Sequence, residues 1–199
     1  MVADRPTAVI TFPPVLNTMC PIEIGDPTTG LAAAFVPRYS IDYITEAWQS
    51  EGLNGVYLLL SDLRFTDGFR AYVGVTTDGF QRALEQRNER THWWSNAILF
   101  ASPNGAGLTA AQTAELKAVL ASLLQRGAHV TVETDDAEPE SLDRQAAQVE
   151  HDGTATSSLT EAMVLFIVRV MFLKGYRSGS LARAVHQFEA TALGQQDAE

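Results

Sequence analysis

Two glycine–aromatic triplets in neighbouring strand-like runs limit most strongly what this chain can fold into. Gly55-Val56-Tyr57 leads into the apolar run Val56–Leu60, and Tyr72-Val73-Gly74 lies within Arg70–Val75. Each run is short, apolar and bounded by turn-forming residues, which predicts two strands joined by a polar loop. Arg82 follows the second triplet by eight residues, on an expected helix. The pattern therefore predicts two phenols and one guanidinium close together, and these groups suit the handling of a phosphodiester.

Further strands and helices are expected on both sides of the triplets. Short β-rich runs ended by turn residues predict strands, and apolar residues at helical spacing predict helices. The expected strands outside the triplets are Thr7–Phe12, Pro21–Ile24, Leu31–Val36, Ala97–Phe100 and Val130–Val132. The expected helices are Ile41–Gln49, Phe80–Asn88, Thr109–Gln125, Thr160–Lys174 and Ser180–Leu193.

Length and composition indicate one domain of ordinary size with a real core. The chain has 199 residues, of which 46% are hydrophobic, and this is enough to bury a core. We divide the sequence into an N-terminal β segment with a lead-in helix (residues 1–51) and a core that holds the triplets (52–132). An acidic, aperiodic segment expected to be a mobile loop (133–156) and C-terminal helices (157–199) follow.

The net charge of −10 is unfavourable for a protein that binds nucleic acid. Much of the acidity is local, however, because eight acidic residues gather between residues 133 and 152, opposed only by Arg144: Glu133, Asp135, Asp136, Glu138, Glu140, Asp143, Glu150 and Asp152. Five arginines lie around the triplets: Arg64, Arg70, Arg82, Arg87 and Arg90. The sequence therefore predicts weak non-specific affinity, with binding that depends on a focused basic patch.

Nothing in the sequence favours a membrane or secreted protein. The N-terminus lacks the basic-then-apolar pattern of a signal peptide, and the apolar run Ala162–Leu173 is shorter than the roughly 20 residues that a membrane span needs. Cys20 is the only cysteine, which excludes an intramolecular disulfide and a cysteine-based zinc site. We expect a cytoplasmic protein. The apolar C-terminal helix is expected to pack on the domain, with self-association as the alternative.

The order and motifs of the central segment resemble those of the GIY-YIG nuclease family. Gly55-Val56-Tyr57 stands at the first family triplet, and the stretch Tyr72–Arg82 is similar to the family's second triplet with its following arginine. His92–Phe100 and Leu108–Ala111 look like two later segments of one bacterial subgroup, whose N-terminal β segment resembles Gly30–Arg38. The resemblance covers most of residues 7–132. It implies an α/β (α+β) fold with a small central three-stranded, mostly antiparallel sheet flanked by helices.

The resemblance also implies metal-dependent hydrolysis of phosphodiesters in DNA. In that chemistry Tyr57 would act as the general base, Tyr72 would position the nucleophile or phosphate, and Arg82 would stabilise charge on the phosphate. The family uses one divalent cation, Mg²⁺ or Mn²⁺, so either is the expected cofactor if the protein is active. The expected partner is nucleic acid, with DNA preferred, and no membrane.

The long helix departs from the family pattern at the metal ligand. The family supplies a Glu there, but alignment on Leu116 and Leu120 places Lys117 at that position. A lysine cannot ligate a magnesium ion. Glu115 would serve only if the helix register were shifted, because two residues turn a helix by about 200°. The metal ligand is therefore unassigned.

Two functions follow from this departure. One is an endonuclease with an unusual metal ligand. The other is a catalytically impaired homologue that binds nucleic acid or a protein through the same groove. Arg87, where many members have His or Tyr, and Lys117 both add positive charge, which predicts that they help to hold a phosphate. Tyr57 and Tyr72 could also be plain cross-strand packing.

Overall fold

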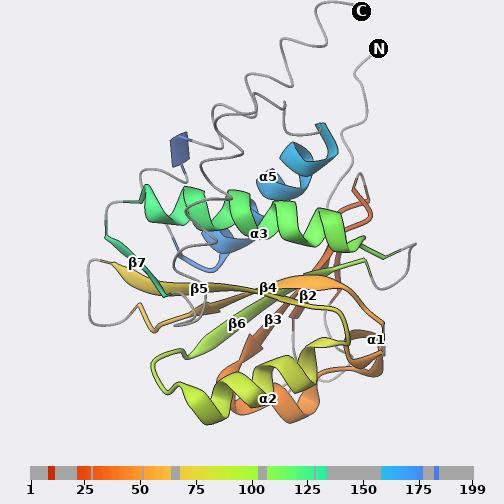
Figure 1. The fold of residues 1–199 in the computed structure, drawn as a ribbon, viewed down its shortest axis with the longest axis horizontal. Helices are drawn as coiled ribbons and strands as arrows, with labels where there is room; N and C mark the ends of the chain where they lie inside the picture. The colour runs from red at the N-terminus through yellow and green to blue at the C-terminus, as the bar shows by residue number, and fades with distance from the viewer. Residues whose placement is uncertain are drawn as a thin grey trace, which may run out of the picture.

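A single β-sheet lies between two layers of helices (Figure 1). The computed structural model describes residues 9–11, 22–27, 29–50, 52–63, 68–102, 107–127, 129–133, 158–176 and 182–183. Helices α3 (Ala110–Gln125) and α5 (Ser158–Leu173) cover one face, while α1 (Glu46–Gln49) and α2 (Phe80–Arg90) lie on the other. The expected α/β class is confirmed, with a mixed, mostly antiparallel sheet.

The sheet contains seven strands among the described residues, so the expected three-stranded sheet is wrong. Its order is β1-β2-β3-β6-β4-β5-β7. The bounds are Val9–Thr11, Ile22–Gly25, Ala32–Pro37, Gly55–Leu60, Phe69–Thr76, Asn96–Ala101 and Val130–Glu133 for β1 to β7. All neighbouring pairs are antiparallel except β5 and β7, which run parallel.

Pairing of β3 with β6 joins the N-terminal strands to the triplet strands. Every residue of Ala32–Pro37 is paired with one of Asn96–Ala101, and Ala33, Ala34 and Val36 are buried. Buried backbone groups require hydrogen-bond partners, and β6 supplies them on one side of β3. The N-terminal β segment is therefore part of the central sheet rather than a separate addition to it.

The two faces of the sheet bury different side chains. Val56, Leu58 and Val73 point to the face under α3 and α5 and share its hydrophobic cluster. Tyr57 and Tyr72 belong to the other cluster, with apolar side chains from α2 and the N-terminal segment. This alternation follows from the two-residue period of a strand. It directs both triplet tyrosines toward α2.

The helix expected over Ile41–Gln49 is interrupted. A 3₁₀ helix, η1 (Arg38–Tyr43), and the one-turn α1 are separated by Ile44 and Thr45, whose backbones are extended. The apolar side chains that suggested one helix, Ile41, Ile44 and Trp48, are nevertheless all buried. The hydrophobic spacing thus identified the buried face correctly, although the backbone between the two helices is extended.

The long helices begin and end close to the expected residues. Thr109 forms a capping box with Gln112 at the start of α3. Helix α5 buries seven apolar side chains against the core, namely Met163, Val164, Phe166, Ile167, Val168, Val170 and Met171. This packing accounts for most of the apolar face of α5. Self-association through α5 stays a prediction. No helix in the described part of the chain is long and apolar enough to cross a membrane.

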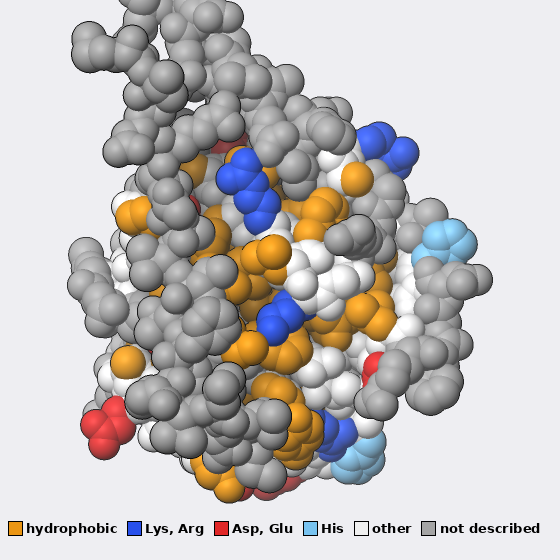
Figure 2. Space-filling model, turned by 180° about the vertical axis from the view of Figure 1, so that it is seen from behind, with side chains coloured by type: hydrophobic (Ala, Val, Ile, Leu, Met, Phe, Trp, Pro, Cys, Tyr) orange, Lys and Arg blue, Asp and Glu red, His pale blue; other side chains and the backbone are white. Residues whose placement is uncertain are grey.

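Two expectations fall outside the described residues. The acidic segment 133–156 is described only at Glu133, which ends β7. The helix expected over Ser180–Leu193 is described only at residues 182 and 183. On the face seen from behind (Figure 2), the visible Lys and Arg side chains lie apart from one another.

Candidate functional site

Strand register brings the two triplet tyrosines together. Tyr57 lies opposite Gly74 and Leu59 lies opposite Tyr72, so the two tyrosines are diagonal neighbours on one face. Their ring centroids are 6.0 Å apart, and the residues are only 4% and 6% exposed. The rings therefore pack as a cross-strand pair, as the packing alternative expected, and they also line an open pocket.

The first triplet glycine permits α2 to approach the sheet. A β-carbon on Gly55 would collide with the ring of Phe80 and with the carbonyl oxygen of Phe100. Phe80 is fully buried at the first position of α2. Glycine at residue 55 thus fixes how closely the N-terminal end of α2 lies against β4.

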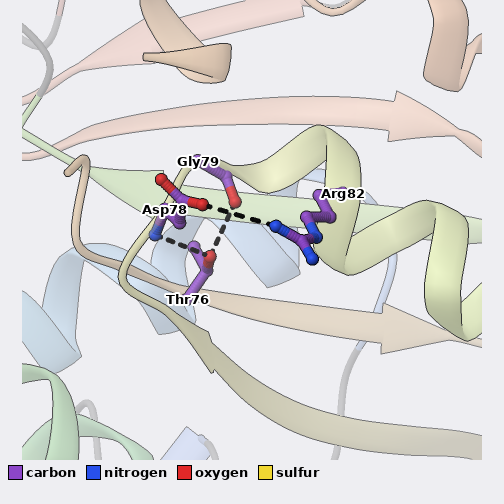
Figure 3. Close-up of polar contacts among 4 residues, drawn as sticks. All are labelled: Thr76, Asp78, Gly79 and Arg82. Atoms are coloured by element: carbon purple, nitrogen blue, oxygen red, sulfur yellow. Dashed lines mark hydrogen bonds and ion pairs between the residues drawn. The ribbon is translucent and has the colours of Figure 1, made fainter. Parts of the chain in front are cut away.

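A tight turn connects β5 to α2 and positions Arg82 (Figure 3). The Thr76 hydroxyl donates a 2.6 Å hydrogen bond to the Gly79 carbonyl and accepts one from the Asp78 amide at 3.3 Å. Asp78 and Arg82 form an exposed ion pair at 3.9 Å. Gly79 has a φ of 77°, a value that favours glycine. The turn therefore presents Arg82 at the surface, beside one carboxylate.

A pocket of about 440 Å³ opens between this turn, α2 and α3. Its lining comprises Tyr57, Tyr72, Val75, Thr76, Thr77, Asp78, Gly79, Arg82, Ala83, Gln86, Arg87, Arg90 and Lys117. The pocket follows the part of β5 that β7 leaves uncovered, because β7 pairs only with Phe69–Tyr72. Among the described residues, no strand pairs with that side of Val73–Thr76.

Positive charge dominates the lining. Among the described residues of the lining, four side chains are cationic, namely Arg82, Arg87, Arg90 and Lys117, and only Asp78 is acidic. Arg87 donates a hydrogen bond to the Tyr72 hydroxyl, and its guanidinium carbon lies 4.0 Å from the centroid of that ring. These contacts hold one fork of N–H donors beside Tyr72 in the lining of the pocket, where it can bind an anion.

The structure gathers five of the six predicted site residues. Tyr57, Tyr72, Arg82, Arg87 and Lys117 all line the pocket. Glu115 does not line it, although it is only half-buried on the same helix. At this point of α3 the pocket is therefore lined by Lys117 and not by Glu115.

Sequence reasoning did not assign Gln86 or Arg90 to the site. Both line the pocket from α2. The spacing of these residues could have identified them. Arg82, Gln86 and Arg90 recur at every fourth residue, so they share one face of a helix.

The lining does not fit a divalent metal. Magnesium and manganese prefer several carboxylate, carbonyl or water oxygens, and Asp78 is the only carboxylate among the lining residues that the structure describes. Asp78 already pairs with Arg82. Among the described residues, no group of three or more His, Cys, Asp or Glu side chains could hold a metal ion. The arrangement is that of an anion site.

Comparisons of the chain with protein-family models, with curated proteins and with solved structures found no match.

Proposed function

We propose that this chain is a GIY-YIG-type protein that binds phosphate groups of nucleic acid, with DNA as the expected form, without a resident divalent metal. The observation that carries this proposal is the presence of Lys117 in a pocket with Tyr57, Tyr72 and Arg82. A lysine ammonium at the family's metal position supplies positive charge that the metal would otherwise bring.

The charge balance of the pocket supports this proposal. In the described part of the lining, four cations and one carboxylate give a formal charge of +3, within a chain whose net charge is −10. A concave site lined by one sign of charge concentrates the field and attracts counter-charged ligands. Guanidinium forks bind phosphate oxygens in a bidentate manner, and a phenol can donate a further hydrogen bond.

Metal-dependent endonuclease activity is the second candidate. It is favoured by the convergence of Tyr57, Tyr72 and Arg82 on one pocket, because the resemblance assigns these positions to the chemical step. It is disfavoured by the lining that the structure describes, which contains a single carboxylate, that of Asp78. The two candidates differ in whether the protein cuts DNA or only holds it.

Two assays on the full chain separate the candidates. The first measures binding of fluorescently labelled DNA by anisotropy, in EDTA. The second measures plasmid cleavage with Mg²⁺ and with Mn²⁺. The parent is compared with Arg82→Ala, Lys117→Glu and Arg126→Ala. Arg126 lies at the C-terminal end of α3, is exposed and does not line the pocket, so it is a matched loss of charge.

We expect the parent and Arg126→Ala to bind DNA in EDTA and to leave the plasmid intact. Arg82→Ala and Lys117→Glu should bind more weakly. Absence of DNA binding by the parent would overturn the proposal. Plasmid cleavage by the parent that disappears in Arg82→Ala would instead establish the second candidate. Cleavage only by Lys117→Glu would show a scaffold that lost its metal ligand.

A further inference from the structure

The pocket extends along α2 farther than a single phosphate requires. Arg82, Gln86 and Arg90 all line it, and they are separated by one helical turn each. At 1.5 Å per residue, Arg82 and Arg90 are about 12 Å apart along the helix axis. One strand of B-DNA has one phosphate per about 3.4 Å of axis. The row of cations therefore spans roughly three to four nucleotides.

The cationic side chains of α2 line the pocket, and its acidic side chains do not. At about 100° per residue, the lining residues from Arg82 to Arg90 occupy an arc of roughly 140°. Phe80 and Leu84 are buried against the sheet on a second arc. Glu85 and Glu89 are exposed and absent from the lining. The helix thus presents cations to the pocket and keeps its acidic side chains outside, which suits contact with a polyanion along its length.

The two ends of this row of side chains should stabilise a bound phosphate to different extents. Arg82 lies in the first turn of α2, where the helix N-terminus favours an anion and where Gly79 provides no side-chain cap. Arg90 is the last residue of the helix, where the helix dipole disfavours an anion. A phosphate should therefore occupy the Arg82 end first, where it replaces the exposed Asp78 carboxylate as the partner of that guanidinium. The Arg90 end gains a phosphate when the covalent chain delivers one.

Base recognition has little support in the lining. Its aromatic residues, Tyr57 and Tyr72, are almost fully buried and pack on each other, so neither presents a free ring face for stacking. The other polar side chains of the lining, with the exception of the Asp78 carboxylate, can donate hydrogen bonds to phosphate oxygens. Phosphate contacts position nucleic acid without reading its sequence.

We infer that Arg90, with Gln86 beside it, forms a second phosphate subsite, so that the pocket binds a continuous nucleic-acid backbone of about three or more nucleotides independently of base sequence. This inference rests on the proposed function. It names a binding residue beyond those expected from the triplets, and it distinguishes a polynucleotide from a mononucleotide or free phosphate as the ligand.

Binding of labelled oligothymidylates by the full chain, from mononucleotide to decanucleotide, tests the inference. The proteins are the parent, Arg82→Ala, Arg90→Ala, Arg90→Lys and Arg126→Ala. Anisotropy is measured in EDTA at several salt concentrations. A mixed-sequence and an adenine decanucleotide are included as further ligands. Arg90 is exposed, and thermal unfolding of each variant verifies that it is folded.

Affinity should rise steeply up to about the tetranucleotide and only slowly beyond it. Arg90→Ala should weaken decanucleotide binding three- to tenfold and reduce the slope of log K against log salt by about 0.7 to 0.9, with no change for the mononucleotide. Arg90→Lys should restore most of the affinity. Arg82→Ala should weaken every ligand, and the base sequence should not matter.

Decanucleotide binding that requires Arg82 but is unchanged in Arg90→Ala would overturn the second subsite and leave the proposed function standing. The second subsite would equally be overturned if the mononucleotide bound as tightly as the decanucleotide. A strong preference for one base sequence would overturn recognition by backbone alone. Failure of the parent to bind any oligonucleotide would overturn the proposed function itself.

Discussion

The ring of Tyr57 lies across Gly74, in the space that a β-carbon on residue 74 would fill. The two residues are directly paired between β4 and β5. A side chain at residue 74 would displace the phenol, so the glycine of the second triplet is required by the tyrosine of the first. The two triplets are therefore one packing unit, and this unit carries Tyr57 to the pocket.

Substitution Gly74→Ala should destabilise the protein and weaken DNA binding. The added methyl group overpacks the site against the Tyr57 ring, which typically costs about 1 to 3 kcal/mol. Urea unfolding and DNA anisotropy measure the two effects. In a Tyr57→Ala background the same change should cost much less, because the obstructing ring is gone. Equal costs in both backgrounds would contradict this packing relationship.

Tyr72 should orient Arg87 for binding. Tyr72→Phe removes the hydroxyl that accepts a hydrogen bond from Arg87 but keeps the ring that the guanidinium contacts. We expect a loss of roughly 1 kcal/mol or less in unfolding free energy and a several-fold loss of DNA affinity at unchanged salt dependence. Arg87→Lys keeps the charge but lacks the planar fork of donors, so it should bind DNA more weakly than the parent. Tyr72→Phe binding that equals the parent would show that the hydroxyl does not position Arg87.

Local patterns predicted which residues lie together in the pocket. Tyr57, Tyr72 and Arg82 are fixed by two adjacent strands and the helix that follows, so short-range spacing was sufficient to bring them together. Predicting the position of Lys117 required only the register of one helix relative to its apolar face. Arg90 was not predicted to line the pocket, because its place there depends on which arc of α2 faces the open edge of β5, and this arrangement is tertiary.

Long-range pairing explains why the sheet was underestimated. The N-terminal strands were expected, but pairing of Ala32–Pro37 with Asn96–Ala101 joins residues more than 50 positions apart, and no local pattern encodes that contact. The parallel pairing of β7 with β5 is likewise non-local. It matters for the site, because the short length of β7 leaves the Val73–Thr76 edge open.

Arg38 should stabilise the C-terminal end of α2 and, with it, Arg90. Its guanidinium donates hydrogen bonds to the carbonyl oxygens of Asn88, Thr91 and His92 at 3.3, 3.1 and 2.9 Å. These carbonyls lie where a helix end leaves acceptors without intrahelical partners. Arg38→Ala should therefore lower the free energy of unfolding by about 2 kcal/mol.

Amide hydrogen exchange localises this effect. The amides of the last turn of α2 should exchange faster in Arg38→Ala, while those of α3 should change only as far as global stability falls. Arg38→Lys is the matched control, since it retains a cation at the helix end but reaches fewer carbonyls. Uniformly faster exchange throughout the sheet and both helices would argue against a local capping role.

Tyr176 should make stability fall in alkaline solution. Its hydroxyl donates to the Ser61 carbonyl at 3.1 Å and accepts from the Asn96 amide at 2.9 Å. Burial raises the pKa of Tyr176 above its ordinary value of 10.0, and Asp62 adds to this effect, while the hydrogen bond from Asn96 opposes it. As pH rises, the unfolded chain therefore loses this proton before the folded protein does. The stabilisation is complete below about pH 10 and is lost as the pH rises through the folded-state pKa.

Urea unfolding of the parent and of Tyr176→Phe from neutral to alkaline pH measures this contribution. At neutral pH the variant should be less stable by about 1 to 3 kcal/mol, because it leaves buried hydrogen-bonding groups unsatisfied. Above pH 10 the difference should shrink, since only the parent loses the tyrosine contribution. Burial lowers the pKa of Lys174, which gives an opposite alkaline slope, but this group is common to both proteins and cancels in the comparison. A difference that stays constant across the alkaline range would show that Tyr176 ionises equally readily in the folded and unfolded states.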